Sequence, residues 1–421
     1  MRILVVHNRY RPTAPSGENV VVDQESSALS SRGHDVVMFQ RHSEDIASWS
    51  PLRRATLPAR VLWSEDSRRG VAEALAGFAP ELVHVHNTFP LVTPSVLYAC
   101  RDASVPVIVT LHNYRLGCPS GDLFRAGRAC HDCLGGTPLP GLVHGCYRGS
   151  RASTAPRVVG SWLHAKAWRT MVAAYIFVSA AQRDLLEPVG LPADRRFVKH
   201  NFVLPPQQQP ELAAESLVAF VGRLDAAKGA PFLMQAWDAF RIRRPRSPLR
   251  LVMVGGGNLS REVARWAAGR PTVTLAGHVS RGEASRIMAR SRAVVVPSQW
   301  EEPFGMVAVE AMAAGTAPVA SAHGAFPELV TPGSDGALFP PTDIDALVEI
   351  LADVDDNPQR WDEYGQQGRR TYRSRFSPEV SIDRLLEIYR FAVEHPIDGP
   401  TPSEPTSERS GRLRQRGGGT W

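Results

Sequence analysis

The stretch from Trp300 to Ser321 constrains the fold of this chain more than any other. Its sequence is W-E-E-P-F-G-M-V-A-V-E-A-M-A-A-G-T-A-P-V-A-S. The apolar run just before it, residues 293–296, has the length of a buried strand, and Pro297 ends that run. Good helix formers follow from Met306 until the A-A-G triplet, whose glycine suits the position after a helix end. The pattern therefore predicts a strand, a loop and a helix of an α/β protein.

The loop and the helix start in this stretch are predicted to bind a sugar nucleotide. The first N–H groups of a helix lack partners within it, and the helix dipole makes this end attractive to phosphate. One glutamate precedes the helix and another lies about one turn inside it, where carboxylates suit sugar and ribose hydroxyl groups. Two isolated glutamates would more often be solvated surface residues. The candidates for donor binding here are Glu302, Phe304, Gly305, Met306, Val307 and Glu310.

The length of 421 residues is too great for one compact core and predicts two domains with a tail. Apolar residues make up 43% of the chain and charged residues 21%, as in an ordinary globular protein. The formal net charge of +6 comes mainly from arginine clusters. Such clusters favour nucleic acid, an anionic membrane surface or phosphate-bearing substrates, or are simply solvated. Since the sequence shows neither a secretory signal nor an apolar run of about 18 residues, we expect a cytoplasmic protein that can contact a membrane peripherally.

The N-terminal half begins with the βαβ pattern of a doubly wound parallel sheet. The apolar run 3–6 predicts a buried first strand, residues 19–31 a helix, and residues 36–39 a second strand. Gly17 stands between the first strand and the helix, where its small size lets the backbone approach a ligand phosphate. The dinucleotide fingerprint G-x-G-x-x-G does not occur there.

Polar residues follow two further predicted strands of this half. Residues 82–85 are followed by His86 and Asn87, and residues 105–111 are followed by His112. Ligands of open α/β sheets bind at the carboxyl ends of the strands, so we expect both histidines to face one cleft. A lone histidine is otherwise most often a structural hydrogen-bonding residue.

Four of the five cysteines lie close together in the sequence. Cys130 and Cys133 form a C-x-x-C pair, and Cys118 and Cys146 lie outside it. Four thiolates in a glycine-rich stretch have the ligand type of a tetrahedral structural zinc site, although the outer spacings match no standard zinc finger. Reduced cysteines without a metal and a redox pair are the alternatives. Structural disulfides are not expected in a cytoplasmic chain.

A cationic site is predicted at the start of the C-terminal half. The strand 217–221 is followed by Gly222, Arg223 and, five residues later, Lys228. Two cations and backbone N–H groups at the carboxyl end of a strand suit a diphosphate. Two further strands end in glycine turns, which contain Gly255 and Gly277-His278-Val279.

The remaining patterns set the domain boundaries. Residues 161–174 are predicted to form a helix with a tryptophan stripe, which is either core or an interfacial surface, and residues 197–203 the last strand of the first half. We divide the chain into an N-terminal Rossmann-like domain (1–204), a linker (205–214), a C-terminal Rossmann-like domain (215–375), a final amphipathic helix (376–395) and a disordered tail (396–421).

The segments E-P-F-G and E-A-M-A-A-G-T-A-P-V closely resemble glycosyltransferase family 4, as do G-R-L-D-A-A-K-G and T-L-H-N-Y-R. The resemblance covers residues 1 to about 395. It implies the GT-B fold, in which two Rossmann-like domains face each other across a cleft. It also implies a retaining transfer from a UDP- or GDP-linked sugar to a glycan or lipid-linked acceptor, in polysaccharide or glycoconjugate synthesis.

The resemblance also implies roles for the residues singled out above. The C-terminal domain would hold the donor, with Arg223 and Lys228 on the diphosphate, and the final helix would return to the first domain. The catalytic candidates are His112, near the transferred sugar, and Glu302, while His86 and Asn87 belong to the acceptor side. The residue after His112 is an asparagine where aspartate is common. The nucleotide base would lie near Gly255, Gly277, His278 and Val279, and Gly17 and Gly222 complete the donor site.

The resemblance requires no catalytic metal, and a subset of the family has a similar cysteine-rich segment. Two other functions remain compatible with the sequence. A GT-B-like epimerase, hydrolase or phosphorylase would rearrange or cleave the sugar nucleotide, and a basic non-enzymatic module would bind nucleic acid or membrane in a salt-sensitive manner. The partners we expect are a nucleotide diphosphate sugar and a glycan or polyprenyl-linked acceptor, with an anionic membrane as an option and without nucleic acid.

Overall fold

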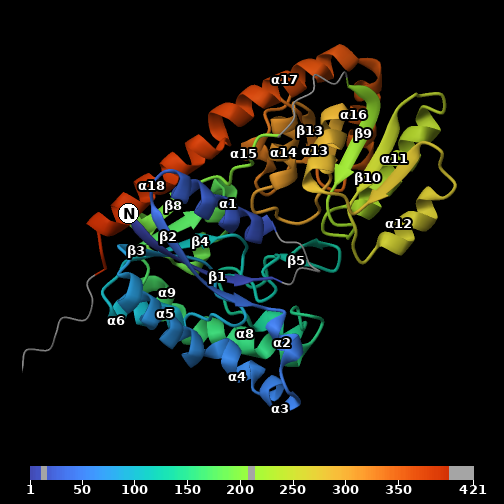
Figure 1. The fold of residues 1–421 in the computed structure, drawn as a ribbon. Coiled ribbons are helices and arrows are strands. Elements are labelled where there is room, and N and C mark those ends of the chain that lie inside the picture. Colours follow the sequence, from blue (N-terminus) through green and yellow to red (C-terminus); the bar gives the residue numbers. More distant parts are fainter. Residues whose placement is uncertain (11–16, 207–213, 398–421) are drawn as a thin grey trace, which may run out of the picture.

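The computed structural model describes residues 1–10, 17–206 and 214–397. Figure 1 shows two α/β lobes, with two long helices running along one side from the second lobe to the first. Most of the predicted linker and the predicted disordered tail lie outside the described residues. We call residues 1–206 the first lobe and residues 214–375 the second lobe.

Each lobe contains one six-stranded sheet whose paired strands are all parallel. The strands form from continuous apolar runs, because helices cover both faces of such sheets. In the first lobe the order is β2 (Asp35–His42), β1 (Arg2–Arg9), β3 (Leu82–Asn87), β4 (Val107–Leu111), β7 (Ala174–Phe177) and β8 (Arg196–Val198). In the second lobe it is β11 (Val273–Gly277), β10 (Arg250–Val254), β9 (Glu215–Val221), β12 (Ser291–Val296), β13 (Ala317–Ser321) and β14 (Ala337–Phe339).

The strand order reverses direction once in each sheet, and these points position the candidate site. The chain moves outward from β1 in one direction to β2 and in the other to β3, and likewise from β9 to β10 and to β12. A crevice opens at such a switch point, outside the carboxyl ends of the strands. The segments that follow β9 and β12 contain Arg223 and Glu302.

The helices of the first lobe are mostly short. They are α1 (Gly17–Ser31), α2 (Asp45–Ser48), α3 (Pro51–Ala55), α4 (Leu57–Leu62), α5 (Glu65–Phe78), α6 (Ser95–Asp102), α7 (Leu139–Val143), α8 (Arg151–Leu163), α9 (Ala165–Thr170) and α10 (Ala180–Leu185), with 3-10 turns η1 (Glu187–Val189) and η2 (Ala193–Arg195). A separate two-stranded antiparallel hairpin, β5 (Phe124–Arg125) and β6 (Arg128–Ala129), lies in the cysteine-rich loop.

The helices of the second lobe and of its C-terminal extension follow the same α/β alternation. They are α11 (Ala230–Arg243), α12 (Ser260–Ala267), α13 (Arg281–Arg290), α14 (Met306–Ala314), α15 (Phe326–Leu329), α16 (Ile344–Asp356), α17 (Pro358–Arg375) and α18 (Pro378–Glu394). The predicted strand, loop and helix around Trp300 are thus β12, the loop 297–305 and α14.

The last helix, α18, packs against the first lobe although it follows the second in sequence. Its buried apolar residues share a core with Ile3 and Val5 of β1 and with Ile108 of β4. They are Ile382, Leu385, Ile388, Tyr389 and Ala392. Burial of each large apolar side chain stabilises this packing by about 1.5–3 kcal/mol. The helix therefore holds the two lobes together, as Figure 1 shows for the red segment.

Two predicted elements differ from the structure. The helix predicted for 161–174 is two helices: α8 begins ten residues earlier, at Arg151, and ends before His164, whose ring nitrogen Nε2 bonds the carbonyl oxygen of Leu62 at 2.7 Å. The strand predicted for 197–203 ends at Val198. The next residue, Lys199, still donates its backbone N–H to Phe177 of β7, and its buried side chain contacts Glu25 of α1 and Ser381 of α18.

Candidate functional site

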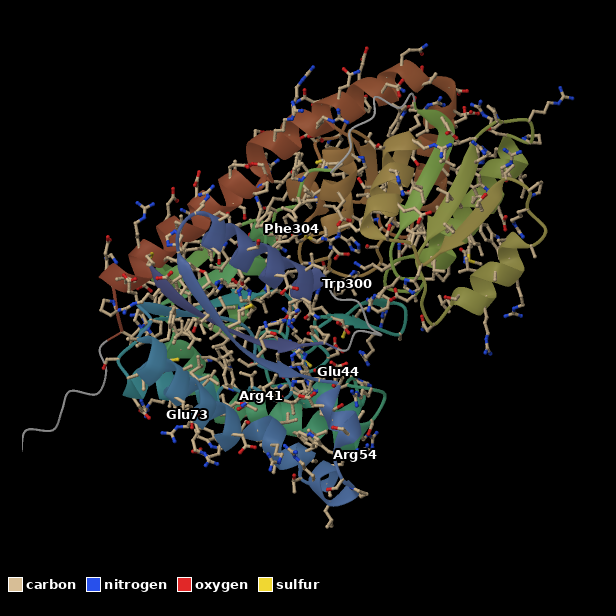
Figure 2. The ribbon with its side chains drawn as sticks, viewed as in Figure 1. Arg41, Glu44, Arg54, Glu73, Trp300 and Phe304 are labelled. Atoms are coloured by element: carbon tan, nitrogen blue, oxygen red, sulfur yellow. The ribbon has the colours of Figure 1, made fainter. Side chains whose placement is uncertain are left out.

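A cavity of about 790 Å³ lies between the lobes, at the carboxyl ends of both sheets. Both lobes contribute its walls, and Trp300 and Phe304 lie at the junction of the lobes in Figure 2. Of the predicted site residues, those that line the cavity are Gly17, His112, Gly222, Arg223, Lys228, Gly255, His278, Val279, Glu302, Phe304, Gly305, Met306 and Val307. The structure therefore brings together the start of α14, the turn with Arg223 and Lys228, and His112, which were predicted to follow three separate strands.

The turn after β9 is tightly packed against the turn after β10. Gly255 has a φ of 127° and its missing Cβ would lie only 2.0 Å from the carbonyl oxygen of Gly222. Only glycine fits at this position. The close packing of the two turns leaves the backbone of both on the cavity wall, beside Arg223, whose side chain is 62% exposed and pairs with Asp225 at 3.2 Å.

Lys228 and Glu302 form an ion pair within the cavity wall. The distance from Lys228 Nζ to Glu302 Oε2 is 2.6 Å, and the same carboxylate oxygen accepts hydrogen bonds from Trp300 Nε1 at 3.0 Å and Ser298 Oγ at 3.2 Å. Lys228 Nζ also lies 5.1 Å from the centre of the Trp300 ring. Glu302 is 7% exposed, so its carboxylate is held in one orientation by three donors.

The helix α14 begins at the cavity with Gly305 as its N-cap residue, at a φ of 90°. Gly305, Met306 and Val307 line the cavity, so the N–H groups of the first helical turn and the positive end of the helix dipole lie at its wall. Anions are favoured at such a position. Lys228, paired with Glu302, lies on the same wall.

Two predicted donor-site residues, Glu310 and Gly277, are not among the residues that line the cavity. Glu310 lies one turn into α14 and is half-buried, and burial raises the pKa of its carboxyl group while the charge of Arg281 opposes that rise. Gly277 ends β11 with a φ of 65°, and its carbonyl oxygen accepts a hydrogen bond from Gly255 N at 2.8 Å. Gly277 therefore holds the Gly255 turn by this hydrogen bond without itself lining the cavity.

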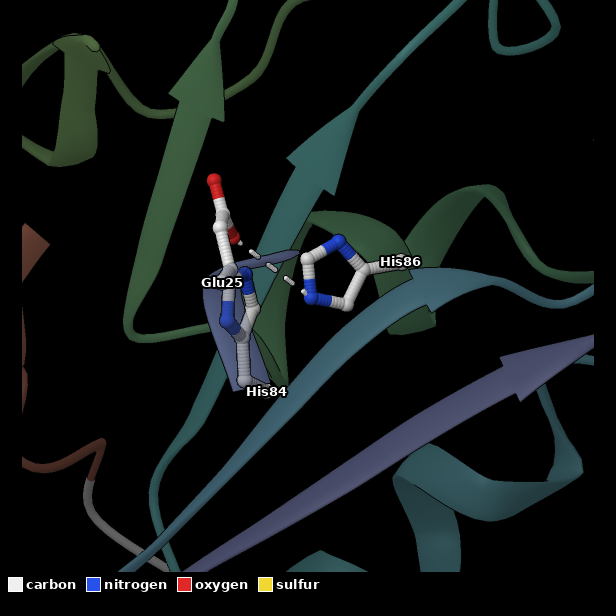
Figure 3. Close-up of side chains that lie close together, drawn as sticks. All are labelled: Glu25, His84 and His86. Carbon is white, nitrogen blue, oxygen red and sulfur yellow. Dashed lines mark ion pairs between the residues drawn. The ribbon is translucent and has the colours of Figure 1, made fainter. Parts of the chain in front are cut away.

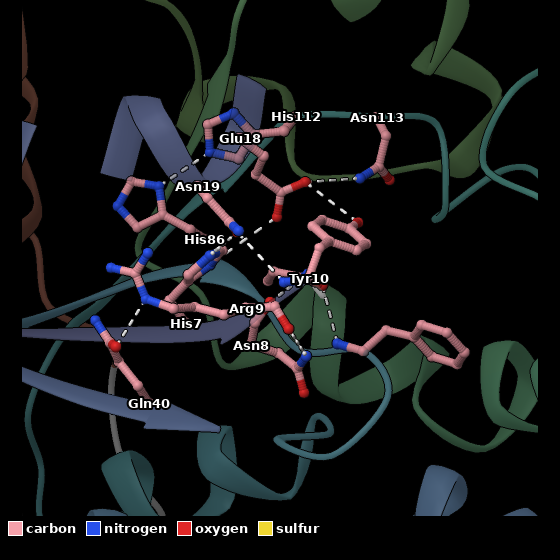
Figure 4. A network of polar contacts seen from close by, with 12 residues as sticks. His7, Asn8, Arg9, Tyr10, Glu18, Asn19, Gln40, His86, His112 and Asn113 are labelled. Atoms are coloured by element: carbon pink, nitrogen blue, oxygen red, sulfur yellow. Dashed lines mark hydrogen bonds and ion pairs between the residues drawn. The ribbon is translucent and has the colours of Figure 1, made fainter. Parts of the chain in front are cut away.

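His112 lines the cavity, but His86, which was predicted to face the same cleft, does not. Asn87, assigned with His86 to the acceptor side, is not part of the cavity wall either. β3 extends to Asn87, and both residues are buried, at 7% and 5% exposure. His86 reaches the cavity only through His112, because His86 Nδ1 lies 3.0 Å from His112 Nε2 and the two rings stack (Figure 4). Burial lowers the pKa of both imidazoles well below the usual value, so both are neutral at neutral pH.

A buried ion pair lies behind these two histidines. Lys199 Nζ contacts Glu25 Oε1, and Glu25 Oε2 lies 3.9 Å from His86 Nε2 (Figure 3). At 3.9 Å these two atoms are too far apart for a hydrogen bond, but the negative charge of the carboxylate favours a proton on the facing nitrogen, His86 Nε2. His86 Nδ1 then accepts the proton of His112 Nε2, which leaves His112 Nδ1 as a hydrogen-bond acceptor.

Glu25, His84 and His86 place three ligand-type atoms within 4.8 Å of one another. The set is nevertheless a structural cluster. Both nitrogens of His84 are occupied at 2.7 Å, by Tyr389 and Thr110, and Glu25 already has the cation of Lys199. A second cation at Glu25 would meet the charge of Lys199 in a buried site.

Sequence reasoning missed a polar group on the first-lobe side of the cavity. Glu18, the second residue of α1, accepts hydrogen bonds at 3.4 Å from Tyr10 and Asn113 (Figure 4). Arg115 in turn donates a hydrogen bond to the Tyr10 hydroxyl oxygen. Burial raises the pKa of Glu18 to about 7, and the charge of Arg115 opposes the rise. The sequence shows a glutamate directly after Gly17. The neighbouring residues gave no indication that the side chain of this glutamate is buried.

Hydrogen bonds across the cleft hold the second lobe to the first, and one of them binds the loop 297–305. Ser179, which caps α10, donates to the carbonyl oxygen of Pro303 at 2.7 Å. Glu328 of α15 accepts from the backbone N–H of Ala180 at 2.7 Å and pairs with His200 Nε2 at 2.6 Å. Sequence reasoning missed both contacts, which depend on how the lobes are docked.

Family models match both lobes of the chain. Residues 16–201 match the glycosyl transferase 4-like domain and residues 206–371 match glycosyl transferases group 1. The chain is 25% identical to a glycogen synthase of Mycobacterium tuberculosis over 434 residues, which covers 97% of this chain and 99% of that protein. It is 32% identical over 238 residues to a D-inositol 3-phosphate glycosyltransferase of Rhodococcus erythropolis, covering 54% and 52% of the two chains.

Solved structures share the same two-lobed fold. A sucrose-phosphate synthase of Thermosynechococcus elongatus superposes with a TM-score of 0.65 at 20% identity and covers 92% of this chain and 98% of its own. The Anabaena protein HepE, solved with UDP, gives a TM-score of 0.62 at 17% identity and covers 93% and 100% of the two chains. The two parallel sheets and the solved structures show the GT-B fold. Because both lobes match glycosyltransferase domains, the chain belongs to the glycosyltransferases that join a family-4-like domain to a group 1 domain, and it is a transferase enzyme.

Proposed function

We propose that this enzyme transfers a sugar, with retention of anomeric configuration, from a nucleotide diphosphate sugar to a glycan or lipid-linked acceptor. One observation carries the proposal: Lys228, Arg223 and the start of α14 converge on one cavity wall, beside the anchored carboxylate of Glu302. Cations and N–H groups there suit a diphosphate, and a fixed carboxylate suits sugar hydroxyl groups.

The donor is expected to lie along the second lobe. The diphosphate would replace Glu302 as a partner of Lys228 or share Lys228 with it, and would order the exposed Arg223 side chain. The base would lie over the glycine turn at Gly255, beside His278, and Glu310 would hold the ribose from the edge. Because HepE has been solved with UDP and with UDP-glucose, a uridine donor is the first to test.

The chemical step requires stabilisation of the departing diphosphate and of an oxocarbenium-like sugar. Lys228, Arg223 and the α14 dipole would stabilise the negative charge that develops on the leaving group. His112 is neutral, so it is suited to hold a sugar hydroxyl group through Nδ1 rather than to attack the anomeric carbon. We therefore favour attack by the acceptor on the same face as the leaving phosphate, without a covalent sugar–protein intermediate.

The acceptor is expected to reach the reacting sugar from the first lobe. A second cavity, of about 250 Å³, lies there between the cysteine-rich loop and α8, with Phe89, Trp162 and Trp168 in its wall. α8 also exposes Val159, Trp162 and Leu163 to solvent. Apolar surface of this kind supports an acceptor with a lipid part, handled at a membrane surface. No helix in the described part of the chain is long and apolar enough to cross a bilayer.

Calorimetric titration with UDP, GDP and their glucose, galactose and mannose derivatives tests donor binding. A charge-assisted hydrogen bond contributes about 1.5–3 kcal/mol, so Lys228→Met is expected to weaken diphosphate binding about 10- to 150-fold. Lys166→Met, at an exposed lysine of α9, is the matched control and should leave binding unchanged. Failure of every nucleotide to bind, or equal effects of the two variants, would contradict the proposed donor site.

Product analysis separates transfer from the other chemistries of this fold. The enzyme is incubated with labelled donor, with and without a lipid-linked glycan acceptor, and the label is followed. We expect label in the acceptor with the donor's anomeric configuration. Release of free sugar at the same rate with and without acceptor would favour hydrolysis, and a changed sugar nucleotide would favour epimerisation.

A further inference from the structure

The cysteine-rich loop, residues 114–146, has little apolar core of its own, because its buried residues Tyr114, Cys118 and Leu123 belong to the core of the first lobe. Its regular structure is one hairpin, β5–β6, and one five-residue helix, α7. The hairpin brings its two ends together, because Cys130 N donates to the carbonyl oxygen of Leu123 at 2.8 Å. A loop of this length with so little apolar core is ordinarily held by some other device.

Tight contacts bring the cysteine-bearing segments of this loop together. A Cβ on Gly117 would lie 2.5 Å from a Leu134 side-chain carbon, so the segments of Cys118 and Cys133 touch. A Cβ on Gly141 would lie 2.7 Å from the ring of Pro119, so the Cys118 segment also packs on α7, just before Cys146. Glycine at both positions permits this close approach.

The four cysteines line one small cavity of about 20 Å³, which is room for about one water-sized atom. All four thiols are free of disulfides. We propose that Cys118, Cys130, Cys133 and Cys146 bind one structural zinc ion in this cavity. The assignment stands apart from the proposed transfer reaction, because it depends only on this loop.

The chemistry of the ligand set selects the ion. Four thiolates favour tetrahedral zinc, or iron, over magnesium, calcium or manganese, and a site with four protein ligands is closed to substrate and therefore structural. Within the described chain no three of these sulfur atoms lie within 4.8 Å of one another. Zinc binding therefore requires rotation of the thiol side chains toward the centre of the cavity, where Zn–S bonds are about 2.3 Å long.

The same loop forms part of the 790 Å³ cavity between the lobes and contacts the loop 297–305 of the second lobe. Ser120, Gly121 and Asp122 line the 790 Å³ cavity. His131, between the C-x-x-C cysteines, lies 3.2 Å from Glu301, the neighbour of Glu302. Zinc would thus fix a segment that bridges the two lobes beside the 790 Å³ cavity.

Metal analysis of the full chain, purified under reducing conditions without a metal-affinity tag, tests the site. We expect one zinc per chain, and loss of most of it in Cys133→Ser and Cys118→Ser. Cys100→Ala is the matched control, because Cys100 is buried in the sheet core away from the loop and should retain the zinc.

Titration of the wild-type protein gives a second measurement that does not depend on whether the variants fold. Stepwise reaction of thiols with an organomercurial reagent, followed with a zinc indicator dye, should release one zinc for the four loop thiols. Removal of zinc by a chelator should also lower the melting temperature, and added zinc should restore it. A zinc content below about 0.1 per chain after growth and refolding in zinc, zinc retention in both serine variants, or iron in its place would overturn the assignment.

Discussion

The buried pair of Lys199 and Glu25 offers the sharpest test of the structure, through the substitution Lys199→Met. The Lys199 side chain is fully buried and that of Glu25 is 2% exposed. Lys199 also donates to Ser381 Oγ of α18 at 3.2 Å, so it joins α1 of the first lobe to the C-terminal helix. Methionine keeps most of the volume and removes the charge, which leaves the Glu25 carboxylate buried beside two histidines.

The expected cost follows from this burial. Removal of one partner of a buried ion pair costs about 3–5 kcal/mol, because the other charge is left without compensation. For a domain of about 200 residues each kcal/mol lowers the melting temperature by about 2–4 °C. We therefore expect Lys199→Met to lower the melting temperature of the first lobe by about 6–20 °C.

Differential scanning calorimetry and urea unfolding at neutral pH measure the effect. Arg384→Met is the matched control, since Arg384 forms an exposed pair with Glu387 on the surface of α18 and should matter by less than about 1 kcal/mol. The double variant Glu25→Gln, Lys199→Met should regain most of the lost stability, because no unpaired charge remains. A single variant within about 1 kcal/mol of the wild type, or a double variant less stable than the single one, would refute the reasoning.

Three further predictions concern the cleft. Burial raises the pKa of Glu18 to about 7, so the folded chain binds this proton more tightly than the unfolded chain and stability is lost as the pH rises from about 4.5 to 7. Glu18→Gln should remove about 3 kcal/mol of that loss, measured by thermal melts from pH 5 to 8. The same pH dependence of stability in the variant and the wild type would contradict this. Although burial alone would raise the pKa of Glu328, its hydrogen bond to His200 lowers it, so its contribution is present above pH 4.5 and is lost in acid. Glu328→Gln should cost about 1–3 kcal/mol at pH 7 and almost nothing at pH 3. His86→Phe removes the bond to His112 and should lower kcat about tenfold with an unchanged Kd for the donor nucleotide, whereas a weaker Kd would show that His86 supports the donor site instead.

Short-range patterns predicted the elements whose signals are local. The apolar runs of β1, β9 and β12 and the helix former run of α14 are recognisable because parallel strands are buried on both faces and helices end at glycine. Lys228 and Glu302 could be named for the same reason, since each follows directly on a strand end. The prediction failed at Lys199, where a charged residue read as part of a strand is buried in an ion pair instead.

The sequence by itself thus determined the two parallel sheets, their order along the chain and the residue types of the candidate donor site. Only the tertiary structure decided which of these residues meet. His86 is buried behind His112 and Glu18 lies on the cavity wall, because β1, β3 and β4 follow one another in the sheet although about 100 residues of sequence separate β1 from β4. The packing of α18 on the first lobe was likewise decided by the tertiary structure. The apolar stripe of a helix shows in the sequence that one face is buried, but it does not show which part of the protein covers that face.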